Sequence, residues 1–480
     1  MSLATAQTHG APHRTWARDD AHSALVGAMM WVLIVLMIVP EGLDYQAMLS
    51  GVTAPTGGVV SRVLWLAVLG ASLWIILRRR ALAGLLVGTL NPFLLVLVGL
   101  ALASLAWSID AGLTARRLLR MATIVLACVA FVLMGWHARR YQNVVRPIVT
   151  LMLLGSLAFG LAFPQFAIHD QVSPELAGAW RGLTNHKNGL GGLACLGLIL
   201  WVHAGLTREV KWLAALTGSA IAAACLMLSR SSTSMATAVL VIAVMLLTLR
   251  SGRTLRPYLP VLIAVLVGLL MFYAFSLLGL IPGRSILTAP ISVLSEKDST
   301  LTGRTDIWWI LAEHISLRPL LGSGYAAYWT GAPIPGTESY VFMTRMGAFY
   351  PGTAHNGYFD ILNDLGWVGL LGLLAYAATH VRQVLRLMRS HWGQGALYLA
   401  PLLLQLVSNL SESRWFSVLS VDFVFMTLAS TGLARSMLEV RLRAHFGEPG
   451  LAQGPTRAPE TARPPLASQT PHPRPRGFTA

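Results

Sequence analysis

Long apolar runs separated by short polar segments make up most of the chain. A run of roughly 20 residues is long enough to cross the hydrocarbon core of a bilayer as a helix, and tilt allows some variation in that length. Twelve runs are predicted to cross, and they cover residues 24–40, 59–77, 85–107, 121–136, 144–163, 189–205, 213–228, 235–249, 261–280, 358–379, 396–410 and 416–433. The pattern therefore predicts an all-α, polytopic membrane protein with about twelve transmembrane helices.

The order of these runs divides the chain into five parts. A polar leader, 1–23, precedes nine spans within 24–280, and a polar loop with short helices fills 281–354. Three more spans occupy 355–436, and a tail, 437–480, follows. No small-residue cleavage site follows the first run, so we expect it to be retained as a span. The end of the tail is rich in Pro, Ala, Arg and Thr, a composition typical of a disordered segment.

The composition excludes a soluble domain. Hydrophobic residues make up 55% of the 480, charged residues 12%, and the mean hydropathy is +0.62, whereas soluble domains carry about 25% charged residues. The net charge of +16 is divided into short clusters between apolar runs, which indicates membrane orientation and not nucleic-acid binding. The three cysteines lie inside apolar runs and are expected to be small buried hydrophobes without disulfides.

Basic residues alternate along the connections. If the N-terminus is cytoplasmic, every second connection should be basic, and five such connections comply. They contain Arg78, Arg79 and Arg80; Arg139 and Arg140; Arg208 and Lys211; Arg250, Arg253 and Arg256; and Arg382, Arg386 and Arg389. Further arginines follow the last span. The alternation predicts a bacterial inner-membrane protein with both termini in the cytoplasm and residues 281–354 in the periplasm.

The outer connections also contain cations, which orientation does not explain. These are Arg116, Arg117, Arg120, Arg181, Lys187, Arg230, Arg304 and Arg414. Guanidinium groups bind phosphate oxygens bidentately, so a cluster near the lipid headgroups favours a ligand that carries phosphates. Asn185, Asn188 and Asn356 lie in the same outer segments. We therefore predict that this face binds a phosphorylated substrate.

His355 is the candidate general base. It stands at the start of the tenth run, after Thr353, which is expected to cap the helix. The positive end of a helix disfavours an imidazolium, so the ring would be neutral and able to accept a proton near pH 7. The alternative is a solvated interfacial side chain without a role. No D-x-D sequence or clustered His, Cys and Asp ligands occur on this face, so neither a metal nor a cofactor is expected.

Other candidates have structural alternatives. Arg230 follows a helix C-terminus, where it could cap the helix or bind a ligand. Arg304 opens a short helix that must end before Pro319, and it could instead pair with Asp306 or with a headgroup. Asp422 lies inside an apolar run, and pairing with an arginine is expected for it.

Aromatic residues and glycines in the loop also admit simple explanations. Trp308, Trp309, Tyr325 and Trp329 could be interfacial anchors, which we favour, or a surface on which sugars stack. Gly322 and Gly324 are expected to mark a turn.

Two motifs in this region resemble those of a known family. The sequence GRTDIWWILAEHISLRPLLGSG, followed by HNGYFDILNDLGWVGLLGLL, resembles the O-antigen ligase and polymerase superfamily, in particular its ExoQ-like exopolysaccharide polymerases. RGLTNHKNGLGG and SRSS also fit, so the resemblance covers about residues 181–369. It implies a helical, membrane-embedded GT-C type glycosyltransferase that takes a glycan from an undecaprenyl diphosphate carrier at the periplasmic face without a metal. The family's essential arginines would correspond to Arg230 and Arg304, and its essential histidine to His355.

Three functions remain open at this point. We favour a polymerase that joins lipid-linked repeat units by inverting transfer, with Arg304 and Arg230 stabilising the leaving diphosphate. A ligase that transfers the same donor to a lipid A core or a protein is the closest alternative, because both reactions need the same site chemistry. A glycolipid transporter would place polar sites near the bilayer midplane and show repeats, which this chain does not. Expected partners are the lipid-linked glycan, the bilayer, and polysaccharide co-polymerase and export proteins.

Overall fold

The computed structural model describes residues 12–39, 58–137, 139–170, 176–252, 254–277 and 301–446. The twelfth-run tail beyond residue 446, most of the leader and residues 278–300 of the predicted loop lie outside the described residues. Within the described ranges the regular structure is helical, with one isolated β-bridge between Ile168 and Trp180. The all-α prediction is therefore confirmed for these residues.

The helices follow one another with short connections. They are α1 (Pro12–Ile38), α3 (Val59–Arg78), α4 (Arg80–Val87), α5 (Pro92–Ala103), η2 (Ser104–Ala106), α6 (Ala111–Leu133), α7 (Arg140–Ala162), α8 (Pro164–Ala167), α9 (Lys187–Leu206), α10 (Trp212–Leu228), α11 (Ser232–Arg250), α12 (Leu259–Leu277), α14 (Leu301–Leu317), η3 (Glu338–Tyr340), α15 (Val341–Arg345), α16 (Gly357–Met388), α17 (Trp392–Ser408) and α18 (Val421–Phe446).

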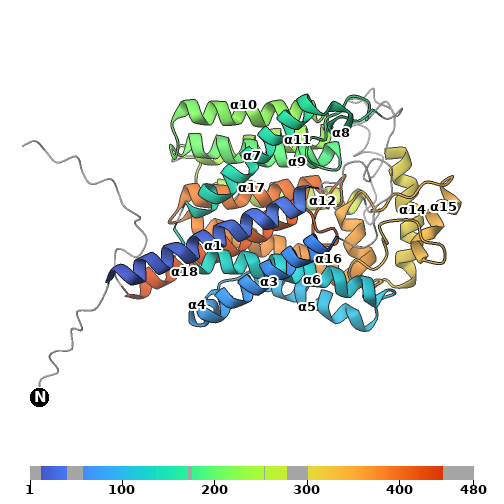
Figure 1. Ribbon diagram of the computed structural model, residues 1–480, viewed down its shortest axis with the longest axis horizontal. Helices are drawn as coiled ribbons and strands as arrows, with labels where there is room; N and C mark the ends of the chain where they lie inside the picture. Colours follow the sequence, from blue (N-terminus) through green and yellow to red (C-terminus); the bar gives the residue numbers. More distant parts are fainter. Residues whose placement is uncertain are drawn as a thin grey trace, which may run out of the picture.

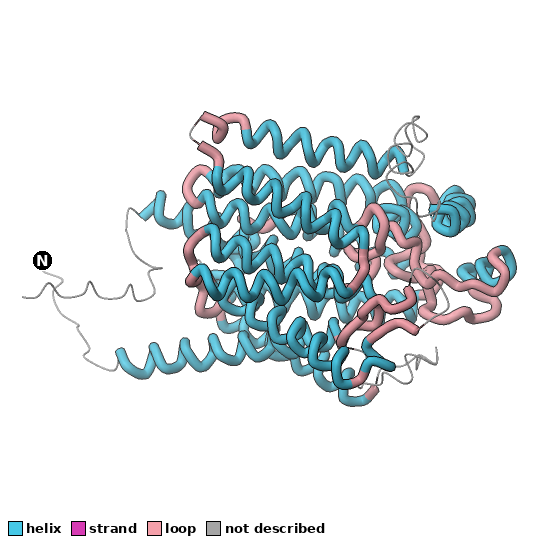
Figure 2. Tube along the Cα trace, turned by 90° about the horizontal axis from the view of Figure 1, so that it is seen from above, coloured by secondary structure: helices cyan, strands magenta, loops and turns pink. Residues whose placement is uncertain are grey.

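The long helices run side by side in one bundle, and the short ones gather at one end of it (Figures 1 and 2). α8, α14 and α15 lie at that end, whereas α4 and the C-terminal end of α18 lie at the opposite end (Figure 1). The connection with Arg78 and Arg79 is thus at the end away from α14. Arg304 and the basic connection after α3 are therefore on different sides of the bundle, as the alternation of charges requires.

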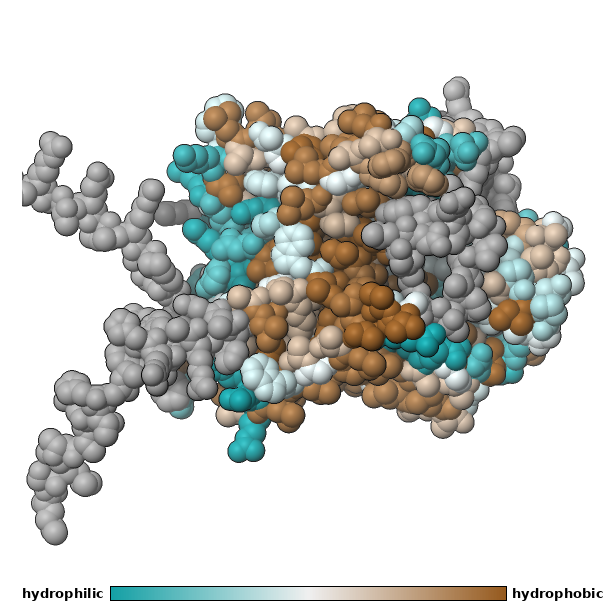
Figure 3. Space-filling view, in the orientation of Figure 1, coloured by the Kyte–Doolittle hydropathy of each residue, from teal (hydrophilic) through white to brown (hydrophobic). Residues whose placement is uncertain are grey.

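An apolar belt surrounds the middle of the bundle. Hydrophobic side chains dominate the centre of the visible face, and hydrophilic ones lie toward its two ends (Figure 3). By length and hydropathy, five described helices can cross a membrane: α3, α7, α9, α11 and α16. The bent pair α4 and α5 would make a sixth. The protein is thus a multi-pass membrane protein, while the count of twelve spans stays a prediction.

Several predicted boundaries were wrong. The run 85–107 is not one helix, because α4 and the segment Pro92–Ala106 meet at a bend of 101°. Asn91 makes the new start: its side chain accepts a hydrogen bond from the backbone N–H of Phe93, and Pro92 occupies the first turn. The last helix begins at Val421 and not at residue 416, and it continues to Phe446, so residues 437–446 of the predicted tail are helical.

The segment before the fourth run is also helical. α6 begins at Ala111, capped by the Asp110 carboxylate, which accepts a hydrogen bond from the backbone N–H of Leu113. Arg116 and Arg120 therefore lie on the first turns of a helix and not in a loop. The three cysteines are buried and free, as predicted.

α16 is broken at Gly366, and a loop fills the break. The φ of Gly366 is 62° and its ψ is −160°, a conformation that only glycine adopts readily. The break exposes backbone groups, and the loop 319–324 satisfies them. Ser323 N–H donates to the carbonyl of Asn363 at 2.8 Å, and Trp367 N–H donates to the carbonyl of Pro319 at 2.9 Å.

Two glycines make this close approach possible. A Cβ at Gly322 (φ 67°) would lie 2.5 Å from the backbone carbon of Asp364, and one at Gly366 would lie 2.3 Å from that of Leu320. The turn predicted at Gly322 and Gly324 is therefore confirmed. Its role is to dock the segment after α14 against the broken helix that carries the candidate base at its start.

Candidate functional site

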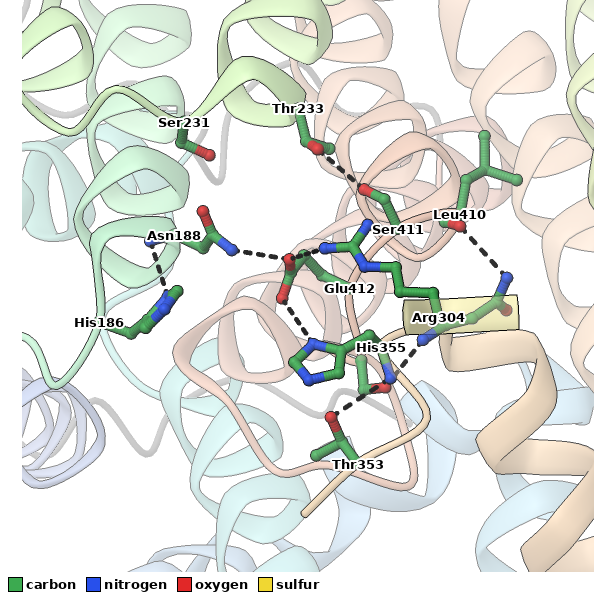
Figure 4. Close-up of polar contacts among 12 residues, drawn as sticks. His186, Asn188, Ser231, Thr233, Arg304, Thr353, His355, Leu410, Ser411 and Glu412 are labelled. Carbon is green, nitrogen blue, oxygen red and sulfur yellow. Dashed lines mark hydrogen bonds and ion pairs between the residues drawn. The ribbon is translucent and has the colours of Figure 1, made fainter. Parts of the chain in front are cut away.

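The candidate site is centred on Glu412. Its Oε1 accepts hydrogen bonds from Asn188 Nδ2 at 2.7 Å and from Arg304 Nη2 at 3.1 Å. Its Oε2 lies 3.8 Å from His355 Nδ1. The three side chains converge on this one carboxylate (Figure 4). The structure thus joins predicted site residues from distant parts of the chain through a residue that the sequence analysis did not single out.

Four elements bring these side chains together. Asn188 is in the first turn of α9, and Arg304 is in the first turn of α14. His355 directly precedes α16, and Glu412 lies in the connection between α17 and α18. Three of the four groups therefore stand at helix N-termini, where partial positive charge favours anions.

The turn that carries His355 has a defined cap. Asn356 is the N-cap of α16: its side-chain oxygen accepts hydrogen bonds from the backbone N–H groups of Tyr358 and Phe359. The predicted cap, Thr353, was wrong, because its hydroxyl accepts from His355 N–H instead, at 3.3 Å. Asn356 is fully buried, and its Nδ2 donates to the carbonyl of Leu410. Its side chain is therefore engaged in holding the turn.

The charged groups of the site are only partly exposed. The exposed fractions of the side chains are 29% for Arg304, 33% for His355 and 14% for Glu412. Burial opposes the charge on Glu412, but His355 and the guanidinium groups of Arg414 and Arg304 outweigh it, so the pKa of Glu412 is below its usual value. Glu412 is thus an ionised carboxylate at neutral pH, and it partly neutralises Arg304.

Two histidines support the N-terminus of α9. His186 Nδ1 accepts a hydrogen bond from Asn188 N–H, and His169 Nε2 accepts one from Lys187 N–H. Burial and nearby cations lower the pKa of each ring to about 4. Both rings are therefore neutral acceptors at pH 7. They hold the helix end from which Asn188 reaches Glu412.

Arg230 is not in contact with this cluster among the described contacts. It follows α10 with a φ of 49°, and its Nη1 donates to the carbonyl of Ala177 at 3.0 Å. The guanidinium also packs beside Gly178, where a Cβ would lie 3.2 Å from Nη1. The structure therefore places Arg230 against the loop before α9, and its role in binding diphosphate stays a prediction.

Arg414 and Arg181 are buried. Arg414 Nη1 lies 2.7 Å from Asp422 Oδ2, and Nη2 donates to the carbonyl of Asn188. The expectation that Asp422 pairs with an arginine is thus confirmed. Arg181 is 3% exposed, and its Nε donates to the carbonyl of Phe166 at 2.7 Å. Both guanidinium groups are engaged with the protein and are shielded from a ligand.

The remaining predicted substrate-binding residues lie at the surface around the site. Arg116 and Arg120 are exposed on α6, and the guanidinium of Arg120 lies over the ring of Trp65 at 5.9 Å. Asn185 is exposed and Lys187 is half-buried. The described contacts join neither of them to Glu412. In the part of the chain that is described, no three His, Cys, Asp or Glu side chains are grouped closely enough to hold a metal ion.

The expected aromatic anchors are mostly internal. Trp308, Tyr325 and Trp329 are buried, whereas Trp309 is 61% exposed. Trp308 stacks on Phe359, with ring centroids 5.3 Å apart and an interplanar angle of 17°. The preferred interpretation as membrane anchors was therefore wrong for the three buried residues, which pack α14 and its loop onto the start of α16.

Glu412 was missed because it looks unremarkable in the sequence. It lies in the outer connection SESR, whose arginine was selected and whose acid was not. The available signal was an acid in a short connection on a face that otherwise collects cations. Only the fold shows that this acid meets both Arg304 and His355.

Comparisons with known proteins agree with this region of the chain. Residues 217–374 match the family model described as O-antigen ligase. Over 203 residues the chain is 32% identical to the exopolysaccharide production protein ExoQ of Rhizobium meliloti (strain 1021). The match covers 40% of this chain and 44% of ExoQ, so it spans less than half the length of that relative. The predicted resemblance is confirmed.

Proposed function

With its resemblance to the O-antigen ligase and ExoQ-like family as the premise, we propose that this membrane protein is a glycosyltransferase. Its reaction would be the polymerisation of oligosaccharide repeat units, carried on undecaprenyl diphosphate, into exopolysaccharide at the periplasmic face of the inner membrane. The observation that carries the proposal is the convergence of Arg304, His355 and Asn188 on Glu412. The name of the matched relative, an exopolysaccharide production protein, favours this product.

The leaving diphosphate would be stabilised by arginine. Breaking the bond between the sugar C1 and a phosphate oxygen leaves the electron pair on the diphosphate, and fixed cations can stabilise that charge. Arg304, 29% exposed at a helix N-terminus, is available for this contact. Its ion pair with Glu412 at 3.1 Å would be exchanged for the bidentate contact with phosphate. Arg230 is proposed to bind the same diphosphate from the opposite side of the site.

His355 would take the proton of the acceptor hydroxyl as its oxygen attacks C1. The Nδ1 of His355 faces the Glu412 carboxylate at 3.8 Å, which leaves Nε2 for the acceptor. A carboxylate beside the ring orients it and stabilises the imidazolium that forms. Attack in line with the leaving diphosphate inverts the anomeric centre. The proton is then held by the His355–Glu412 pair.

The other predicted contacts divide into two groups. Arg116, Arg120, Asn185 and Lys187, at the surface, are proposed to contact the carrier or its sugars. Arg181, Arg414 and Asn356 are engaged with the protein, so we propose that they support the site and do not bind substrate. Asn188 belongs to both groups, because it contacts Glu412 from an incompletely buried position.

Ligation is the second candidate function. The family model that matches residues 217–374 is described as O-antigen ligase, and the same diphosphate and base chemistry would transfer a finished chain to a lipid A core or a protein. The two functions differ in acceptor alone. We favour polymerisation because of the exopolysaccharide relative.

Electrophoresis of glycans from a strain that lacks the gene tests the proposal. If the protein is a polymerase, long chains disappear and single repeats remain on the carrier. If it is a ligase, long carrier-linked chains accumulate. An unchanged profile of lipid-linked and released glycan would contradict both functions, and restoration by the intact gene is the control.

A further inference from the structure

The peptide group before His355 is held from both sides. Its carbonyl, on Ala354, accepts a hydrogen bond from Trp308 Nε1 at 2.9 Å. The N–H of Ala354 donates to Asp360 Oδ1 at 3.2 Å, and Trp329 Nε1 donates to the same oxygen at 2.8 Å. Two indoles and one carboxylate therefore fix the orientation of this peptide, and we call them the Ala354 clamp.

The clamp is shielded from water. The exposed fractions are 4% for Trp308, 5% for Trp329, 1% for Asp360 and 0% for Ala354. A buried hydrogen bond cannot be replaced by one to solvent, so breaking it leaves unpaired polar groups. The bonds of the clamp are consequently expected to persist in the working protein.

His355 needs such support because of its backbone. Its φ is 48°, in the left-handed region that residues with a Cβ seldom adopt. Such a conformation persists only where the surroundings determine it. The neighbouring contacts also act on the backbone: His355 N–H donates to Thr353 Oγ1, and Asn356 N–H donates to Ser413 Oγ. The direction of the imidazole is thus set by the contacts of the turn.

Trp308 also belongs to the helix that carries Arg304. The two residues are four positions apart in α14, so they lie on one face of the helix, a turn apart. The indole bond to Ala354 and the stacking on Phe359 therefore hold the helix of Arg304 against the turn of His355. Arg304 is an expected phosphate ligand and His355 the expected base, and Trp308 links their two supports.

We propose that Trp308 is a positioning residue that sets the placement of His355 relative to Arg304, through its bond to the Ala354 carbonyl in the clamp. The inference rests on the proposed function and extends it. Reaction requires the acceptor hydroxyl and C1 of the donor to be held in a narrow geometry, and a misplacement of about 1 Å can reduce the rate about 10²-fold. Loss of the bond should therefore affect turnover more than donor binding.

Adjacent tryptophans supply a matched pair of variants. Trp308→Phe removes the indole N–H and keeps an aromatic ring against Phe359, whereas Trp309→Phe makes the same change at a position that is 61% exposed. The purified full chain in nanodiscs would be assayed with the lipid-linked repeat unit extracted from the deletion strain. We expect kcat to fall about 10- to 10²-fold for Trp308→Phe, with KM changed less than about threefold. Trp309→Phe should retain kcat within about twofold.

Hydrogen exchange of the peptide that spans residues 351–360 supplies a readout independent of activity. The Ala354 and His355 amides should exchange faster in Trp308→Phe than in Trp309→Phe. Equal kcat and equal exchange in the two variants would overturn the proposal. So would a selective rise in KM with kcat unchanged, because that result assigns Trp308 to substrate binding.

Two further arms separate the possible failures. If Trp308→Phe does not fold, benzothienylalanine at position 308 keeps the shape of the ring and lacks the N–H, and the same kcat loss is expected. Wild-type protein that does not turn over this donor would refute the proposed function itself. His355→Ala supplies the reference, since its turnover should fall about 10²- to 10⁴-fold, the contribution of a general base.

Discussion

Two arginine–carboxylate pairs meet in the connection between α17 and α18, and they differ in every property that matters for function. Arg304 and Glu412 lie 3.1 Å apart with side chains 29% and 14% exposed. Arg414 and Asp422 lie 2.7 Å apart with side chains 10% and 1% exposed. The first pair has a histidine and an asparagine beside it, whereas the second binds only protein groups.

The difference separates a pair that can exchange partners from one that cannot. A partly exposed ion pair contributes little to stability, about 0–1 kcal/mol, so a diphosphate can replace Glu412 at Arg304 at small cost. Removing one member of a buried pair leaves an uncompensated charge and costs about 3–5 kcal/mol. Sequence alone presents both arginines as outer cations, and burial is what distinguishes them.

The largest effect is expected for Arg304. Both Arg304→Ala and Arg304→Lys should lower polymer formation about 10³- to 10⁵-fold, the range by which single arginines stabilise a phosphoryl transition state. Lysine fails because its ammonium cannot bind two phosphate oxygens in a planar fork. Polymer per unit of protein in membranes is the measurement.

Arg318→Ala is the matched control for Arg304, since Arg318 pairs with Glu338 on the surface at 2.9 Å. It should have near-normal activity. Normal polymer from either Arg304 variant, at normal protein level, would remove this residue from the mechanism.

Arg414 should show the opposite behaviour. Arg414→Ala is expected to lower the free energy of unfolding by about 3–5 kcal/mol, because Asp422 stays buried without its cation. Thermal unfolding of the purified protein measures this change. The double variant Arg414→Met with Asp422→Leu should recover much of the stability, since a buried pair can often be replaced by apolar groups. A double variant as unstable as Arg414→Ala alone would show that the Asn188 carbonyl, and not Asp422, is the partner that matters.

Glu412 should have a smaller effect on turnover and an opposite one on binding. Glu412→Gln removes the charge that faces His355, and we expect turnover to fall about 10- to 10²-fold, less than loss of the base itself. Arg304 loses its competing anion, so undecaprenyl diphosphate should bind more tightly to the variant. Titration of each protein with undecaprenyl diphosphate tests this, and weaker binding would make Glu412 part of the ligand site instead.

The smallest effect concerns pH. The pKa of His186 is about 4 in the folded protein, below the value near 6.5 of an unperturbed histidine. Between these values the unfolded chain binds more protons, so stability is complete above about pH 6.5 and is lost as pH falls toward 4. The loss is expected to be roughly 1–3 kcal/mol for this ring.

His186→Asn separates the titration from the cap, because asparagine also caps helices well. The variant should lose less stability than the wild type between pH 6.5 and 5. This window lies above the range in which Glu412 titrates, and His169, whose pKa is also about 4, still contributes in both proteins. Identical pH dependence of the melting temperature would show that His186 does not supply the effect.

The sequence predicted those features that depend on apolarity and on single residues. The runs 59–77 and 189–205 correspond closely to α3 and α9, because a bilayer demands a continuous apolar stretch. The run 85–107 failed, since apolarity is the same on both sides of a bend, and the local signal was the Asn-Pro start of α5. The charged segment 111–120 was assigned to a loop, although a helix can extend past the apolar region.

The site was predicted in part for a similar reason. Arg304 and His355 were chosen for their chemistry and their place at helix starts, and the fold brings both to one carboxylate. Glu412 carries no periodic or compositional signal, and its importance arises from contacts between distant segments. Burial of Arg181 and Arg414 likewise depends on packing that no single stretch of sequence specifies.

The docking of residues 319–324 into the break of α16 restricts how relatives could be recombined. Backbone bonds run in both directions, from Ser323 to Asn363 and from Trp367 to Pro319, and the glycines on both sides must be present for the approach. A chimera that takes the outer loop from one relative and the following helix from another would carry mismatched halves of this contact. Functional exchange of acceptor specificity should therefore require residues 301–368 to be transferred as one block.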